Sequence, residues 1–271
     1  MKRFTKHALL CCNTLAIILS MILIGAAAAE EEMPGPDFRV DNGIFKMGKT
    51  EPVSRTVTIF ADGKVYDFML DTQEIVIYNE QDGSFTLINI SKDSKGVQTV
   101  LTKQLIDQAI ERLMQRATNE KDPRTQFLYN PKFAPLEQDA MTGQLIFKSP
   151  WLTYRVKTKL GGFKMAKRYY RFADAYARLN TITSPGGRPP FARMLVNKTL
   201  GESSMLPQTI LLTNGEESDP KAARFRSEHR YEMKLEKSSQ ERIEKVKESL
   251  KNLKVVPLEE YMTLLESSSQ S

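Results

Sequence analysis

Outside its first 29 residues, this chain has almost none of the side chains that usually bind metals or act as nucleophiles. Both cysteines, Cys11 and Cys12, and one of the two histidines, His7, lie within that stretch. Residues 30–271 therefore contain no cysteine and a single histidine, His229. This absence excludes disulfides, thiolate nucleophiles and cysteine metal sites there. We expect no zinc site either, because zinc sites draw on several His and Cys side chains.

Long hydrophobic runs are equally scarce, because the only one extends from Ala8 to Gly25. It follows three basic residues and precedes four alanines and three glutamates: Lys2, Arg3, Lys6, Ala26–Ala29 and Glu30–Glu32. This order is typical of a secretory signal peptide, which we place at residues 1–29. The run is also nearly as long as the roughly 20 residues of a membrane-spanning helix. We therefore predict export to the periplasm or cell envelope, with anchoring by an uncleaved N-terminal helix as the alternative.

A strong excess of one charge is missing too. The whole chain has 39 basic and 33 acidic residues, a net charge of +6. Without residues 1–29 the balance is 36 to 33, a net charge of +3. This surplus is too small to indicate a nucleic-acid partner.

One segment matches the phosphate-binding P-loop pattern letter for letter: Gly43-Ile44-Phe45-Lys46-Met47-Gly48-Lys49-Thr50. A P-loop requires a helix that begins at its Gly-Lys-Thr end, so that backbone N–H groups face the phosphates. Here Pro52 and the β-branched Val53 follow, and they favour a strand. We therefore expect a hairpin with two glycines and treat the match as chance.

Catalytic signals are weak throughout, and no cofactor is indicated. The acidic residues Asp62, Asp67, Asp71, Glu74 and Asp82 are available for carboxylate-based hydrolysis. Most of them fall at hairpin ends, where Asp is favoured for turn geometry. There is no Gly-x-Ser-x-Gly elbow. An envelope hydrolase is accordingly the third of three functional hypotheses.

The pattern from Phe38 to Leu101 predicts a β-meander, with Asp62-Gly63 and Asp82-Gly83 as hairpin turns. A helix is expected at 102–117, a long connection at 118–140 and strands at 144–158. Further elements follow in order: a helix at 164–182, strands at 192–197 and 205–213, a strand at 225–235, and a helix that begins at Ser238, with Glu241 at capping-box spacing, and ends before Pro257. We predict one α+β domain at 30–265 and a flexible tail at 266–271. We expect its architecture to be a curved, half-barrel-like antiparallel sheet packed against two or three amphipathic helices.

The strand at 225–235 has the clearest alternation in the chain. His229, Tyr231 and Met233 belong to its apolar face, and charged residues occupy the other. These three residues are the predicted lining of a ligand site on the concave face of the sheet. The alternative for His229 is a buried, hydrogen-bonded core residue.

The helix at 164–182 combines aromatic residues with a basic face. Its cations are Lys164, Lys167, Arg168, Arg171 and Arg178. A basic amphipathic helix can lie on an anionic membrane or bind an acidic partner. The alternative is that its aromatics pack on the sheet and its cations are simply solvated.

The export signal and the hairpin Phe60-Ala61-Asp62-Gly63-Lys64-Val65-Tyr66-Asp67-Phe68 resemble uncharacterised exported proteins of planctomycete-type bacteria. The order of elements is also similar to that of periplasmic lipoprotein carriers and related lipid-binding domains. That resemblance implies an open sheet around an apolar cavity, and a partner that is a lipid, a lipoprotein or an anionic membrane surface. Our leading hypothesis is a non-enzymatic binding or carrier protein for a hydrophobic or amphiphilic ligand. The alternative is an envelope interaction module whose core is filled by its own helices.

Overall fold

One curved, open sheet of twelve strands organises the computed structural model, which describes residues 35–72, 74–90, 96–118, 120–184 and 186–268. The predicted signal peptide and the last residues of the predicted tail lie outside this part. The strands are β1 (Phe38–Lys46), β2 (Ser54–Ala61), β3 (Lys64–Met69), β4 (Glu74–Asn79), β5 (Phe85–Asn89), β6 (Val97–Leu101), β7 (Glu137–Gln138), β8 (Leu145–Lys148), β9 (Leu152–Leu160), β10 (Met205–Asn214), β11 (Ala223–Glu232) and β12 (Lys254–Val255).

The strand order is β12-β6-β5-β4-β3-β2-β1-β11-β10-β9-β8-β7, and all pairs are antiparallel except the short pair of β12 with β6. Six helices pack against the sheet in the described part of the chain. They are α1 (Lys103–Ala117), α2 (Pro123–Tyr129), α3 (Phe163–Thr183), α4 (Phe191–Glu202), α5 (Lys237–Leu250) and α6 (Leu258–Ser268). The predicted α+β class with an antiparallel sheet is confirmed.

The meander forms as predicted because its turns contain residues that accept positive φ. Asp62 and Gly63 have φ values of 51° and 67° in the turn between β2 and β3, and Gly83 has a φ of 71°. The P-loop-like segment also forms a hairpin, in which β1 runs through Gly43 to Lys46 and Gly48 turns with a φ of 80°. No helix begins at Gly48, so the phosphate-binding geometry is missing.

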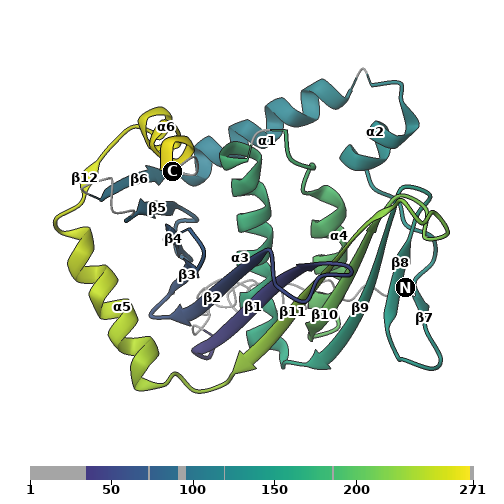
Figure 1. Ribbon diagram of the computed structural model, residues 1–271, viewed down its shortest axis with the longest axis horizontal. Helices are drawn as coiled ribbons and strands as arrows, with labels where there is room; N and C mark the ends of the chain where they lie inside the picture. The colour runs from purple at the N-terminus through teal and green to yellow at the C-terminus, as the bar shows by residue number, and fades with distance from the viewer. Residues whose placement is uncertain (1–34, 73, 91–95, 119, 185, 269–271) are drawn as a thin grey trace, which may run out of the picture. The chain divides into compact units, whose positions relative to one another are not determined.

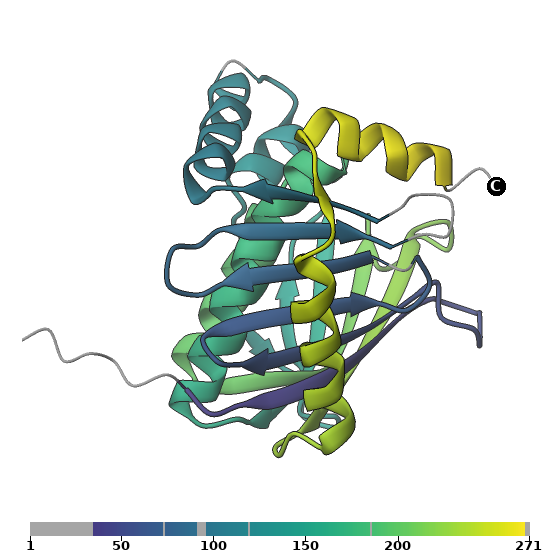
Figure 2. The ribbon, with the colours of Figure 1, turned by 90° about the vertical axis from the view of Figure 1, so that its left-hand side faces the viewer.

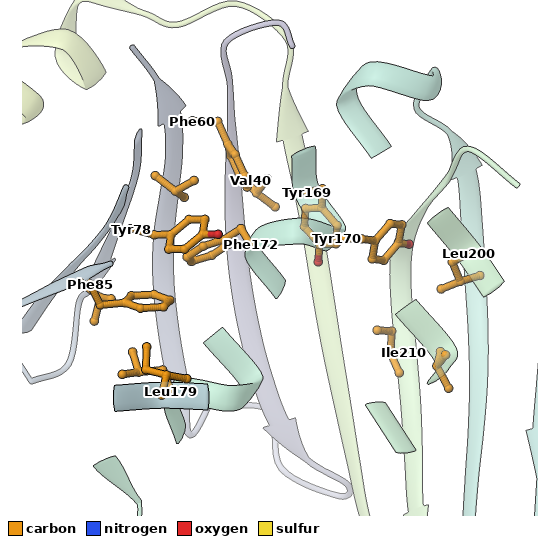
Figure 3. Close-up of a cluster of buried hydrophobic side chains, with 14 of the residues drawn as sticks. Val40, Phe60, Tyr78, Phe85, Tyr169, Tyr170, Phe172, Leu179, Leu200 and Ile210 are labelled. Atoms are coloured by element: carbon orange, nitrogen blue, oxygen red, sulfur yellow. The ribbon is translucent and has the colours of Figure 1, made fainter. Parts of the chain in front are cut away.

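The concave face of the sheet is filled by α3 and α4 (Figure 1). Figure 3 shows α3 side chains between the two halves of the sheet, with Phe172 toward Tyr78 and Tyr170 toward Leu200. The Phe172 ring meets Phe60 edge-on, with centroids 5.7 Å apart. These contacts leave α3 as the central element of the larger core.

The convex face has a second, smaller core under α5. Figure 2 shows α5 crossing the strands of the meander on this side. Its buried Ile243 and Val246 pack on side chains that alternate with the concave set, including Ile59, Tyr66 and Ile77. The two faces of the meander therefore belong to two separate cores.

Four local predictions differ from the structure. The expected strand at 192–197 is part of α4, because Ala192, Val196 and Leu200 recur at helical spacing and become its buried side. The expected capping box at Ser238 does not form, since α5 begins at Lys237 with Glu236 as an N-cap that makes no side-chain bond. The connection at 118–140 contains α2 and β7, and α6 covers the start of the predicted tail, through Ser268. Among the described residues, no helix is both long and apolar enough to cross a bilayer.

Candidate functional site

A chain of polar side chains crosses the concave face from β3 to β11. Asp67 on β3 accepts a 2.6 Å hydrogen bond from the Thr58 hydroxyl, and Thr58 accepts one of 3.0 Å from the Asn42 amide nitrogen. The Asn42 Oδ1 atom lies 2.8 Å from His229 Nδ1, and the Ser227 hydroxyl lies 3.2 Å from His229 Nε2. Because the Asn42 amide donates to two threonine hydroxyls, its oxygen is the acceptor, and His229 carries its proton on Nδ1.

The two titratable groups of this network are both driven toward their neutral forms. Burial raises the pKa of Asp67 from 3.8 to about 6, and the hydrogen bond from Thr58 opposes that rise. Burial lowers the pKa of His229 from 6.5 to about 3, and the nearby positive charge of Arg193 lowers it further. At neutral pH His229 is therefore an uncharged imidazole.

Ser227, His229 and Asn42 have the hydrogen-bond order of a nucleophile, a base and an orienting group. A general base works best when its pKa lies near the operating pH, and the low pKa of His229 makes it a weak base. The hydrogen bonds satisfy polar groups that the fold places under α3. The arrangement therefore fits a partnered core histidine better than a catalytic one.

The predicted lining residues are only partly brought together. His229 and Tyr231 lie on the concave side, paired with Asn42 and Val40 of β1, and the Tyr231 hydroxyl donates to the Pro207 carbonyl. Met233 lies beyond the end of β11 and is 59% exposed, so it does not line the concave interior. Tyr169 of α3 packs on both His229 and Tyr231. That the first two contact a ligand remains a prediction.

The predicted basic face of α3 divides into internal and external cations. Arg168 is only 5% exposed, and its guanidinium binds Glu80 at 2.7 Å and Asp37 at 3.1 Å. Arg168 therefore forms a buried ion pair that joins α3 to the meander. The prediction that Arg168 contacts a membrane or an acidic partner is wrong, because its side chain is not at the surface. Arg171 donates to the Glu80 carbonyl at 2.7 Å, and Arg178 lies 3.4 Å from Asp107.

The external cations, Lys164 and Lys167, belong to a surface that we call the basic edge. It consists of three exposed apolar residues and three lysines at the end of the sheet where α3 begins: Leu160, Phe163, Met233, Lys159, Lys164 and Lys167. Leu160 is 82% exposed and Phe163 is 63% exposed. Lys159 Nζ lies 4.4 Å from the Tyr231 ring centre, and Lys167 Nζ lies 5.8 Å from that of Phe163.

Strand register brings the ends of β9 and β11 to the end of the sheet where α3 begins (Figure 1). Leu160 pairs with Met205 at the start of β10, and Met233 directly follows Glu232, which pairs with Arg39 at the start of β1. The first described residue of the domain, Gly35, is also here, because its carbonyl accepts a hydrogen bond from Arg168 on the first turns of α3. Gly35 therefore lies beside the basic edge.

Two hollows lie on the convex side of the sheet. A wide one of about 480 Å³ is lined by charged residues of mixed sign, including Asp41, Arg55 and Arg230, together with polar residues and the apolar Phe45 and Pro52. A smaller one of about 220 Å³ lies beside α5 on an apolar floor. The mixed charges of the first indicate no ligand class.

The carboxylates considered for hydrolysis are dispersed. Asp71 pairs with Arg55 at 2.8 Å, Asp62 lies 3.4 Å from Lys247, and Asp82 caps its turn by accepting from the Ser84 amide. Asp67 and Glu74 share the concave side, and burial raises the pKa of both carboxyls. In the described part of the chain, no group of three or more His, Asp or Glu side chains could hold a metal ion.

Sequence reasoning missed Leu160 and Phe163, which flank Gly161-Gly162 at the junction of β9 and α3. Their signal was two large apolar residues beside a glycine pair, where a connection is normally polar. It also missed the residues of the hollow beside α5, because no local pattern marks incomplete coverage of a sheet.

No family model and no curated protein matches the chain. Among solved structures, it is similar to PNGF-II in crystals of space groups C2 and P21, with sequence identities of 10% and 11% and TM-scores of 0.36 and 0.37. The alignments cover 86% of this chain but only 33% and 34% of PNGF-II, so the chain spans about a third of that protein's length. A likeness of this size carries no argument about function.

Proposed function

We propose that this is an exported, non-enzymatic protein of the cell envelope that binds a hydrophobic or amphiphilic ligand and contacts anionic membrane surfaces through its basic edge. The observation that carries the proposal is the basic edge itself. Three large apolar side chains are exposed there, although a folded protein normally buries such residues or uses them for contact. Lysines border them, as in proteins that attach to anionic lipid headgroups.

Two further features support contact at this edge. The N-terminal apolar segment, which we predict to be a signal peptide or a membrane anchor, precedes Gly35 in the chain, and Gly35 lies at the basic edge. Lys164 and Lys167 are exposed, whereas Arg168 of the same helix is held in its buried ion pair, so these two lysines are the α3 cations at this edge that solvent reaches. Each lysine near an anionic surface contributes about 1 kcal/mol to binding.

The test is flotation of the full chain with lipid vesicles. We expect binding to vesicles that contain phosphatidylglycerol and little binding to pure phosphatidylcholine. The triple variant Phe163→Ser, Lys164→Gln, Lys167→Gln should lose this binding. Its control is Val53→Ser, Lys49→Gln, which removes a similarly exposed apolar residue and one lysine from the β1–β2 turn at the other end of the strands. Equal loss in both variants, or no anionic preference in the wild type, would contradict the proposal.

A second function has its own supporting observation. Because α3 fills the concave face, the protein also fits an envelope interaction module with a complete core. In that case the basic edge would bind an acidic protein surface. Purified protein would then bind no vesicles of any composition, and the same triple variant would no longer bind the acidic partner protein.

A further inference from the structure

The hollow beside α5 is a place where the described residues cover the convex core incompletely. Its floor is formed by Phe68, Ile75 and Ile88 from three neighbouring strands, and by Ile90 just after β5. In Figure 2, α5 runs across these strands, so its flank forms one wall. Ile90 is exposed, which leaves apolar surface open to solvent.

The wall and rim of the hollow have a different chemistry from its floor. Val246 and Ser249 of α5 face the hollow, and Arg242 and Lys245 border its opening. The Arg242 guanidinium lies 5.1 Å from the centre of the Phe68 ring, so the cation is held over the apolar floor. An apolar pocket with a cationic rim is complementary to an amphiphile with an anionic head.

Arg242 and Lys245 differ from three lysines within α5 or next to it. Lys237, Lys247 and Lys251 each pair with a glutamate of α5: Glu241, Glu244 and Glu248, respectively. Within the described residues, neither Arg242 nor Lys245 pairs with a carboxylate. The charges on this flank are therefore available to an anionic ligand.

We infer that the hollow binds the acyl chain of a single-chain anionic amphiphile, with its head group at Arg242 and Lys245. This inference deepens the proposed function and rests on it for the ligand class. The volume of about 220 Å³ is below the ~300–1,000 Å³ of ordinary ligand pockets, so it accommodates one short acyl segment and not a two-chain lipid. It also moves the ligand from the concave face, where we predicted it, to the convex face.

Monomeric fatty carboxylates test this inference by calorimetric titration of the full chain at neutral pH. Along the series hexanoate, octanoate and decanoate, each added methylene should tighten binding roughly three- to fourfold until the hollow is full. Decanol, which has the same chain length without the charge, should bind at least tenfold more weakly than decanoate.

Variants separate the two halves of the site. Ser249→Phe places an aromatic ring in the hollow from an exposed position and should abolish decanoate binding while the protein stays folded. Arg242→Gln with Lys245→Gln should reduce the preference for decanoate over decanol to near unity. Lys251→Gln, on a paired lysine at the end of the same helix, is the matched control and should bind like wild type.

The results distinguish this inference from the proposed function. Wild-type protein that floats with anionic vesicles but binds no carboxylate would overturn the inference and leave the membrane contact of the proposed function intact. Decanoate binding that survives Ser249→Phe would also overturn it, because the ligand would then sit elsewhere. Loss of vesicle binding only in the basic-edge variant, together with loss of decanoate binding only in the α5 variants, is the result we expect.

Discussion

The two faces of the sheet are closed to different degrees. On the concave side, α3 and α4 bury aromatic rings against both halves of the sheet, and the polar groups beneath α3 bind one another. On the convex side, one helix covers the meander with a few aliphatic side chains and leaves a hollow beside it. The clearest sequence patterns belong to the concave face, whereas the hollow lies on the convex face beside α5.

This difference has a physical cause. A helix that crosses a curved sheet on its concave side is surrounded by strands, but one on the convex side touches the sheet along a line. Its flanks must then be completed by long side chains, and on α5 these are Arg242 and Lys245. A site on the convex face can thus accept a ligand without disturbing the main core.

The largest expected effect comes from the two cores themselves. Phe172→Ala should reduce the free energy of unfolding by roughly 3–5 kcal/mol, and Ile243→Ala by roughly 2–4 kcal/mol, because each empties part of a buried cluster. Only Ile243→Ala should also weaken decanoate binding, since it loosens the wall of the hollow. Denaturant unfolding and calorimetry at a temperature where both variants are folded measure this. Weakened binding in Phe172→Ala alone would place the ligand on the concave face.

The pH dependence of the concave network comes next. The pKa of His229 falls from 6.5 to about 3 on folding, so its contribution to stability is complete above pH 6.5 and is lost as the pH falls toward 3. Between pH 6.5 and pH 4 the loss should be roughly 3 kcal/mol. His229→Gln should lack this component when unfolding free energies are compared across pH. Identical slopes in the two proteins would show that His229 is not held in its neutral form.

Asp67 should act in the opposite direction. Its pKa rises from 3.8 to about 6 on folding, so its contribution is complete below pH 3.8 and is lost as the pH rises through 6. The loss should be roughly 2–3 kcal/mol, and Asp67→Asn should remove it. The same unfolding experiment between pH 4 and pH 7 measures this effect. A wild type that gains stability relative to Asp67→Asn over that range would contradict the account of the network.

The smallest expected effect concerns α5 on the convex face, whose N-terminus lacks a side-chain capping hydrogen bond. α1 has Thr102 as an N-cap whose hydroxyl accepts from the Leu105 amide, but α5 has Glu236 without such a bond. Glu236→Ser should supply the missing acceptor and raise stability by roughly 0.5–1 kcal/mol, whereas Glu236→Ala should not. Thermal melts of the two variants are the measurement. Equal melting temperatures would mean that the end of α5 is already satisfied.

Local patterns predicted most of the fold. Hairpin glycines located the meander, helical spacing located α1 and α3, and alternation located β11. The segment at 192–197 was mispredicted because Val196 has β propensity, yet its spacing from Ala192 and Leu200 matches a helix and tertiary packing decides. Short α6 was missed although its Leu, Glu and Met residues favour a helix, and in the structure it contacts β6.

The candidate sites were less predictable. The sequence identified the basic helix, but it could not show that Arg168 is turned inward, because its partners Asp37 and Glu80 are distant in the chain. In the sequence, Met233 continues the alternation of β11, but in the structure the strand ends one residue earlier, at Glu232. The hollow forms because α5 does not cover the side chains of β3, β4 and β5 completely. No local sequence pattern shows how completely a helix will cover a sheet.

The most direct test of where the ligand lies is photolabelling with a decanoate that carries a diazirine on its chain, followed by mass spectrometry of the labelled peptides. We predict labels on α5 near Val246 and on the strands beneath it near Ile88, and their disappearance in Ser249→Phe. Labels on Tyr169 of α3 or Tyr231 of β11 would contradict the account and return the ligand to the concave face.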